Sequence, residues 1–153
     1  MKKKRLFILV IAVTVAISMF TGCFNNELSS TDVNTEKNPG VITNGIFSIT
    51  VPEDWPEKIY LEISEDTIKI YQMEAYVYFG GGWLCSIEMY EDDAYLELPQ
   101  YEVLKSEDTS GITYVAQYPS DVQANVENEE SMTEYFEMFS LLPEIVQTFK
   151  LVN

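Results

Sequence analysis

The spacing of apolar residues divides the chain into a strand-rich part and a helical part. Between positions 46 and 118, apolar side chains recur at every second position in short runs bounded by Gly, Pro, Asp or Ser, the period of half-buried β-strands. Near the C-terminus, Met132, Tyr135, Phe136 and Phe139 stand at i, i+3, i+4 and i+7, the spacing of one helix face. The pattern predicts strands at Ile46–Val51, Ile59–Ile63, Thr67–Gln72, Ala75–Phe79, Trp83–Tyr90, Tyr101–Ser106 and Ile112–Tyr118.

Turn-forming residues between these runs predict how the strands connect. Gly80-Gly81-Gly82 lies between two predicted strands and indicates a hairpin; it is not a phosphate-binding loop, because no Gly-Lys-Ser/Thr follows. Asp108-Thr109-Ser110-Gly111 indicates a second hairpin, and Pro143 is expected to break or restart the C-terminal helix. Strands first and a helix last predict an α+β domain, a mostly antiparallel β-sheet with the C-terminal helix packed on it.

The first 23 residues have the layout of an export signal. Four cations, Lys2 to Arg5, precede an apolar run from Leu6 to Phe20 that only Thr14 and Ser18 interrupt, and small residues then lead to Cys23. The run of 15 residues is shorter than the ~20 residues that span a bilayer. The alternative is an uncleaved membrane anchor, since the stretch from Leu6 to Phe24 has 19 residues.

The stretch Phe20-Thr21-Gly22-Cys23 resembles the lipobox of bacterial lipoproteins, with Phe20 where Leu is usual. In that family the cysteine thiol receives a diacylglyceryl group, and a peptidase cuts just before it. The resemblance implies that residues 1–22 are a signal peptide, that Cys23 carries the lipid, and that the protein sits on the outer face of the bacterial cytoplasmic membrane. Two acyl chains anchor a protein where one would let it dissociate.

The rest of the chain divides into a tether and one domain. Residues 23–42 are polar, lack an apolar period and contain Asn38-Pro39-Gly40, so they are expected to form a flexible tether reaching roughly 25 Å. Residues 43–153 have the size of a single domain. We expect Trp55, Trp83 and Phe139 to share its core, which joins the sheet to the helix.

Two patches of this domain resemble the PsbP/Mog1-like α/β/α sandwich proteins. Phe47-Ser48-Ile49-Thr50-Val51-Pro52-x-x-Trp55 is similar to the opening strand of that group, and Ile145-Val146-Gln147-Thr148-Phe149 is similar to its final helix. Together with the predicted Gly80–Glu88 hairpin, the chain also resembles uncharacterised lipoproteins and exported proteins of Gram-positive bacteria with this fold. The resemblance covers roughly residues 45–150 and implies a fold. It transfers no functional residues, because none can be matched here.

The charge of the chain restricts its partners. The formal net charge is −16, and loss of the signal removes four cations, leaving five lysines against 25 acids and a charge of −20. Such a chain is repelled by nucleic acids and by an anionic membrane surface, so we expect no nucleic-acid partner and an attachment that depends on the lipid.

The residue types also limit the chemistry. The chain has no histidine, which removes the usual general base, the usual nucleophile pairs and most zinc sites, so we expect no cofactor. Cys85 would be the one remaining thiol; it is either a small core residue or a nucleophile activated by a lysine. A carboxylate pair for glycoside cleavage stays open among 25 acids.

Two acidic clusters are weak candidates for a divalent cation site, although neither has the spacing of an EF-hand loop. The tyrosines in or beside strands suit either a binding face or half-buried strand positions. We therefore expect a monomeric lipoprotein with a non-catalytic binding or accessory role toward an envelope protein, a basic peptide or divalent cations; the alternatives are a small hydrolase using Asp/Glu carboxylates and a divalent-cation-binding lipoprotein. The acidic clusters are Glu91, Asp92 and Asp93, and Asp121 with Glu127, Glu129 and Glu130; the tyrosines are Tyr71, Tyr76, Tyr78, Tyr90, Tyr95, Tyr101 and Tyr118.

Overall fold

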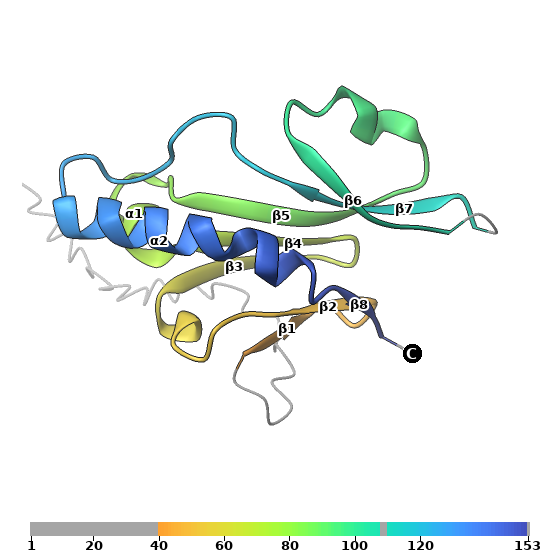
Figure 1. Cartoon of the computed structure of the whole chain (residues 1–153), viewed down its shortest axis with the longest axis horizontal. Helices are drawn as coiled ribbons and strands as arrows, with labels where there is room; N and C mark the ends of the chain where they lie inside the picture. Colours follow the sequence, from red (N-terminus) through yellow and green to blue (C-terminus); the bar gives the residue numbers. More distant parts are fainter. Residues whose placement is uncertain (1–39, 108–109, 153) are drawn as a thin grey trace, which may run out of the picture.

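The structure, a computed structural model, describes residues 40–107 and 110–152 and arranges them in two antiparallel sheets and a long C-terminal helix (Figure 1). This arrangement confirms the predicted α+β class. The strands are β1 (Val41–Thr43), β2 (Phe47–Thr50), β3 (Ile59–Ile63), β4 (Thr67–Gln72), β5 (Trp83–Tyr90), β6 (Tyr101–Glu107), β7 (Ile112–Gln117) and β8 (Lys150–Leu151); the helices are α1 (Met73–Phe79) and α2 (Glu129–Val146), with short 3-10 turns η1 (Trp55–Glu57) and η2 (Asp93–Glu97).

The larger sheet has the strand order β3-β4-β5-β7-β6 and is antiparallel throughout. The predicted hairpin of its last two strands is confirmed, since Glu107 pairs with Ile112 across the turn. The alternating pattern predicted strands β3 and β4 correctly, because their aliphatic residues share the face of the sheet that is buried in the core, as Ile59, Ile68 and Ile70 do.

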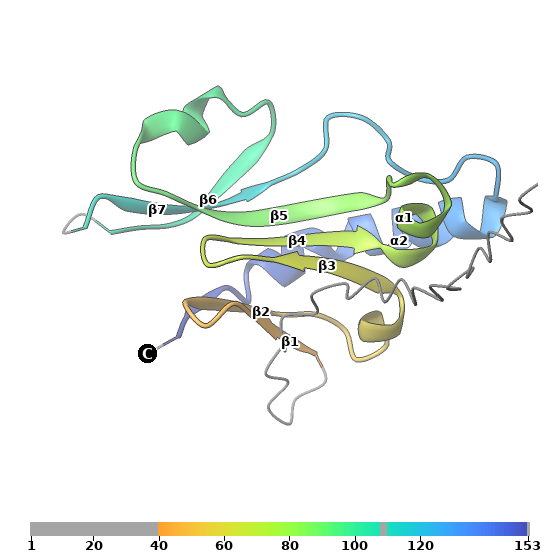
Figure 2. The same ribbon diagram turned by 180° about the vertical axis from the view of Figure 1, so that it is seen from behind.

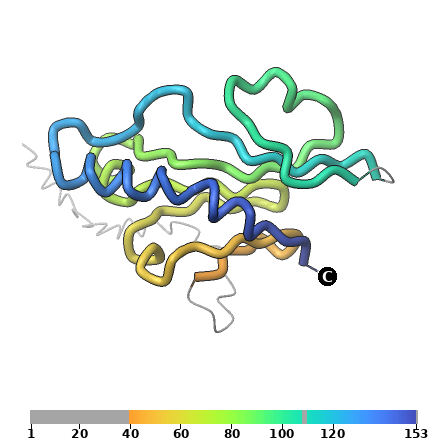
Figure 3. Tube along the Cα trace, in the orientation of Figure 1, coloured from red at the N-terminus to blue at the C-terminus, as the bar shows by residue number. Residues whose placement is uncertain are grey.

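The smaller sheet joins the two ends of the described chain. Its order is β1-β2-β8, so the last strand returns to pair beside the second (Figure 3). Val41 and Ile42, which the sequence analysis placed in the tether, belong to β1, and Ile42 is buried. Phe149 lies beyond the end of α2 and packs against Phe47 and Tyr114, with ring centroids 5.7 and 5.4 Å away.

The prediction of a strand at Ala75–Phe79 and a glycine hairpin after it was wrong. The segment is helix α1, which ends at Gly80 in the left-handed region with φ 74°. The Gly80 N–H donates to the Tyr76 carbonyl at 2.9 Å, a helix C-terminus typical of glycine. Gly82 is also required, because its φ is 81° and a Cβ there would lie 2.7 Å from the Gln72 carbonyl oxygen. A short apolar run cannot by itself distinguish a strand from a helix of two turns.

Helix α2 is not broken at Pro143, contrary to the expectation from the sequence. Asn128 is its N-cap, and its Oδ1 accepts from the backbone N–H groups of Glu130 and Ser131 at 3.1 and 3.2 Å. The helix continues through Pro143 without a break. A proline removes one backbone hydrogen bond, while the buried residues Leu142 and Ile145 on either side keep this last turn against the sheet.

The buried face of α2 is rotated relative to the predicted stripe. Tyr135 is buried and Phe139 packs against the core, but Phe136 is 46% exposed. The face runs instead through Ser131, Tyr135, Met138, Leu142 and Ile145, a helical spacing that spans the whole element.

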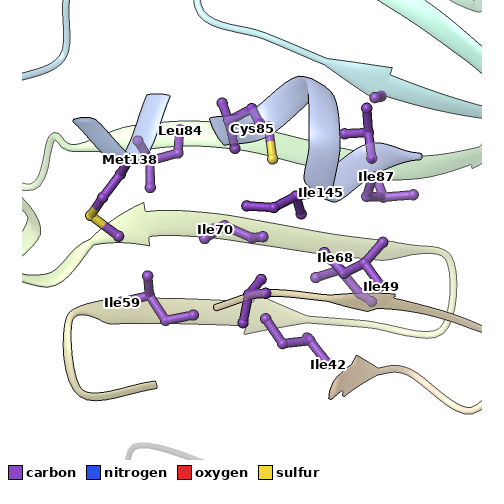
Figure 4. Close-up of a cluster of buried hydrophobic side chains, with 14 of the residues drawn as sticks. Ile42, Ile49, Ile59, Ile68, Ile70, Leu84, Cys85, Ile87, Met138 and Ile145 are labelled. Atoms are coloured by element: carbon purple, nitrogen blue, oxygen red, sulfur yellow. The ribbon is translucent and has the colours of Figure 1, made fainter. Parts of the chain in front are cut away.

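The core lies between α2, the small sheet and one face of the larger sheet (Figure 4). Figure 4 shows Ile68 and Ile70 of β4 and Ile87 of β5 pointing toward Ile145 of α2 and Ile49 of the small sheet. Apolar side chains from all three layers pack into one cluster. The burial of their surface away from water is the main favourable term in the stability of the fold.

A β-bulge separates Trp83 from this core. Ile70 pairs with Cys85 and Tyr71 pairs with Trp83, so β5 has one extra residue at Leu84. Because adjacent residues of β4 point to opposite faces, Cys85 faces the core while Trp83 lies on the face turned away from α2. The expectation of a shared core is therefore confirmed for Trp55, which is buried, and for Phe139, and wrong for Trp83.

Candidate functional site

The predicted lipidation site, Cys23, lies outside the described residues, as do the signal peptide and residues 24–39 of the tether. In the part of the chain that the structure describes, no helix is long and apolar enough to cross a membrane.

Cys85 is a core residue. Its side chain is fully buried on β5, and burial raises the pKa of its thiol to about 12. A thiol that stays protonated and cannot meet solvent is a poor nucleophile. The structure thus confirms the interpretation of Cys85 as a small packing residue.

The two acidic clusters that were candidates for a cation do not form compact sites. Glu91, Asp92 and Asp93 are exposed around the start of η2, where Asp92 caps the turn by accepting from the Ala94 N–H at 2.9 Å. Glu127 accepts from the Tyr78 hydroxyl at 2.6 Å. Across residues 40–107 and 110–152, no three Asp, Glu or Cys side chains are grouped as metal ligands would be.

Two residues of the second predicted cluster, Glu129 and Glu130, line one of two adjoining depressions beside α2. The first has a volume of about 560 Å³ and lies between α1, η1 and the first turns of α2. The second, also about 560 Å³, follows the exposed side of α2, and the two share Glu134. The first is lined by Glu57, Lys58, Met73, Glu74, Val77, Tyr78 and Glu134, and the second by Glu129, Glu130, Thr133, Glu134 and Glu137.

We refer to the six glutamates of these depressions as the acidic strip: Glu57, Glu74, Glu129, Glu130, Glu134 and Glu137. Three of them, Glu130, Glu134 and Glu137, stand at i, i+4 and i+7 on α2. This spacing places them on one side of the helix and spans about 10 Å of its length.

Buried polar contacts hold two members of the strip in place. Gln72 is fully buried at the end of β4, and its Nε2 donates to the Ser131 carbonyl at 2.9 Å and to Glu134 Oε2 at 3.0 Å. Glu74 accepts from the Ser131 hydroxyl and from Asn125 Nδ2, the latter at 3.1 Å. These bonds fasten the carboxylates of Glu74 and Glu134 to β4 and α2, so both are positioned by the fold rather than by flexible side chains.

The one lysine among the lining residues is already paired. Lys58 Nζ lies 2.8 Å from Asp54 Oδ2 and 3.6 Å from Glu134 Oε1. The hydrogen bond with Asp54 is the main reason that the pKa of Lys58 is raised and that of Asp54 lowered. The strip therefore keeps a strong excess of negative charge.

The tyrosines divide between packing and surface. Tyr60, Tyr71 and Tyr76 contact one another on the sheet face away from α2, with the rings of Tyr60 and Tyr76 stacked at 3.8 Å. Burial is the main reason that the pKa of Tyr71 is raised to about 12, and the second is its hydrogen bond to Glu62. Tyr78, by contrast, is exposed and lines the first depression. Tyr90, Tyr95 and Tyr101 form a second group around η2, with ring centroids 6.0 Å apart for the first pair and 5.7 Å apart for the second. The tyrosines thus lie in separate groups, and a binding role for them stays a prediction.

Sequence reasoning missed Glu57, Glu74, Glu134 and Glu137. The signal that could have found the last two was the polar side of α2, where acids recur at helical spacing from Glu130. Glu57 and Glu74 had no such signal, because they come from segments brought together by the sheet.

Comparisons of the chain with family models, curated proteins and solved structures found no match. The resemblances to bacterial lipoproteins and to PsbP/Mog1-like proteins accordingly stay predictions.

Proposed function

We propose that this protein is a membrane-anchored extracytoplasmic lipoprotein whose domain binds a cationic partner without catalysing a reaction. The observation that carries the proposal is the acidic strip, six glutamates around two adjoining depressions with one lysine that is already paired. Charge complementarity of this kind accelerates association with a basic envelope protein or peptide and discriminates against acidic ones.

The N-terminal sequence supports the proposed location. The lipobox-like Phe20-Thr21-Gly22-Cys23 would place a lipid at Cys23, and the polar residues after it would connect the anchor to the domain. The acidic domain would itself be repelled by an anionic bilayer surface. Its charge would thus be directed to soluble or wall-associated cations, and we propose that it acts as a monomer.

The hydrolase alternative requires a carboxyl group with a raised pKa in a cleft. Among the described residues, the carboxyl groups of Asp54, Asp66 and Glu107 have shifted pKa values, and all three are lowered. The first causes are hydrogen bonds from Lys58, Ser64 and Lys105 respectively. These three groups stay ionised at neutral pH, so none of them suits the donation of a proton.

Thermal unfolding distinguishes the divalent-cation alternative from the proposal of a cationic protein or peptide partner. Calcium bound at a folded site would raise the melting temperature after EDTA treatment, by an amount set by its concentration and affinity. We expect no such rise, because the acidic residues of the strip line an extended surface rather than converge on one point. A calcium-dependent rise that is lost in Glu91→Gln/Asp93→Gln would favour that alternative.

The direct test measures binding of octalysine to the full chain at low and physiological salt. The triple variant Glu129→Gln/Glu130→Gln/Glu137→Gln removes three exposed charges of the strip. Exposed ion pairs contribute ~0.2–1 kcal/mol each, so the variant should bind about tenfold more weakly. The matched control Glu53→Gln/Glu65→Gln/Glu97→Gln removes three exposed charges that lie outside the strip.

If both triple variants lose the same affinity, the strip has no special role and net charge alone attracts the peptide. If octalysine does not bind the wild type at low salt, the proposal of a cationic partner is wrong. A weaker affinity in the strip variant, together with an affinity close to that of the wild type in the control variant, would support the proposal.

A further inference from the structure

Five large apolar side chains are exposed at the end of the molecule where α1 lies. Val77 and Val126 are 75% and 72% exposed, and Tyr78, Phe79 and Val122 are each more than half exposed. We refer to these five residues as the apolar patch. Isolated exposed apolar residues are common, but contiguous ones mark interaction sites.

The two segments of the patch adjoin, because they are bound to each other. The Gly82 N–H donates to the Gln123 carbonyl at 2.8 Å, and the Tyr78 hydroxyl donates to Glu127 at 2.6 Å. Figures 1 and 2 show α1 beside the connection that leads from β7 to α2 in both views. Val122 and Val126 therefore flank residues that are bound to α1 or to the turn that follows it.

The patch also borders the acidic strip. Val77 and Tyr78 line the same depression as Glu74 and Glu134. From there the carboxylates continue along α2 through Glu130 and Glu137. One surface thus combines an apolar end with a row of negative charges whose repeat is that of a helix.

We infer that this combined surface binds a cationic amphipathic peptide segment, whose apolar side chains contact the patch and whose basic side chains pair with the strip. The inference rests on the proposed function and names the class of partner. A small polycation or a metal ion would use the carboxylates but leave the patch exposed. An anionic bilayer would cover the patch but is repelled by the carboxylates beside it. An amphipathic peptide satisfies both halves of the surface at once.

The test uses the full chain held in phosphatidylcholine nanodiscs and two labelled peptides of about 18 residues, made of lysine and leucine. In one peptide the leucines follow the helical period, and in the other the same residues are scrambled. Fluorescence anisotropy should give an affinity about tenfold higher for the first peptide. The variant Val122→Ser/Val126→Ser, at two patch residues that line neither depression, should lose this preference and keep the affinity for the scrambled peptide.

Leu96→Ser/Val103→Ser is the matched control, since both residues are exposed and lie on η2 and β6, away from α1 (Figure 1). It should keep the preference. Equal binding of the two peptides by the wild type would overturn this inference and leave the proposed cationic partner standing. Failure of both peptides to bind would overturn both. Slow amide exchange in residues 119–127 before peptide is added, unchanged by peptide, would mean that bilayer or a second copy covers the patch, and would also overturn it.

Discussion

The orientation of α2 can be tested by a pair of substitutions on the same helix. Leu142 is 1% exposed within the core, whereas Phe136, which the sequence pattern placed on the buried stripe, is 46% exposed. Fully buried Leu→Ala changes cost ~2.7–5 kcal/mol, because they lose transfer free energy and leave a cavity. Leu142→Ala should therefore lower the free energy of unfolding by about 3–4 kcal/mol. Phe136→Ala should lower it by less than about 1 kcal/mol.

The measurement is urea unfolding of residues 40–153, followed by circular dichroism, with the slope m compared among the variants to confirm that the transition stays two-state. A total stability of ~5–15 kcal/mol leaves Leu142→Ala measurable but clearly weakened. Comparable losses for the two variants, or a larger loss for Phe136→Ala, would refute the orientation of the helix described above. The helix would then face the sheet with the stripe that the sequence analysis predicted.

Three further outcomes follow from single residues. Cys23→Ser should leave an unprocessed precursor without lipid, and intact-mass analysis that finds no acyl group on the wild type would contradict the lipoprotein assignment. Ser86 is fully buried, and its hydroxyl has no hydrogen-bond partner among the described residues. Ser86→Ala should raise the free energy of unfolding by about 1 kcal/mol in urea titrations. A decrease of similar size would mean that the hydroxyl has a hydrogen-bond partner in the folded protein. The Ser64 hydrogen bond is the main cause of the lowered pKa of Asp66. Its contribution to the free energy of unfolding is therefore present at neutral pH and is lost as the pH falls through the folded-state pKa of Asp66, below 3.8. Ser64→Ala should thus be less stable than wild type at pH 7 and equally stable in strong acid, and a constant difference across the titration would contradict this linkage.

Gln72 connects the stability of the fold to the geometry of the strip. It is buried at the end of β4 and bonds both the backbone of α2 and the carboxylate of Glu134. A buried amide left without partners is costly, so the same bonds that stabilise the packing of α2 also hold Glu134 at the surface. The strip is therefore part of a rigid element, which lowers the entropy lost on binding.

The sequence alone determined the class of the fold and most of its strands. Alternation placed Ile59–Ile63, Thr67–Gln72 and Trp83–Tyr90 correctly, with boundaries that the structure reproduces. The change to helical spacing near Met132 correctly located α2. These inferences succeed because the side-chain period of an element follows from its backbone geometry, which is local. The absence of histidine and the excess of acids are likewise properties of composition.

The tertiary structure decided what neighbouring elements impose on one another. The bulge at Leu84 turns Trp83 away from the core, and it arises where β5 pairs with β4. The turn between helix Met73–Phe79 and β5 is held by bonds across the fold, since the Gln72 N–H donates to the Gly82 carbonyl and the Gly82 N–H donates to the Gln123 carbonyl, both at 2.8 Å. Glu57, Glu74 and Glu134 come together from η1, α1 and α2 through packing on the sheet. Each of these features depends on contacts between residues distant in sequence, and the period of a single segment carries no information about such contacts.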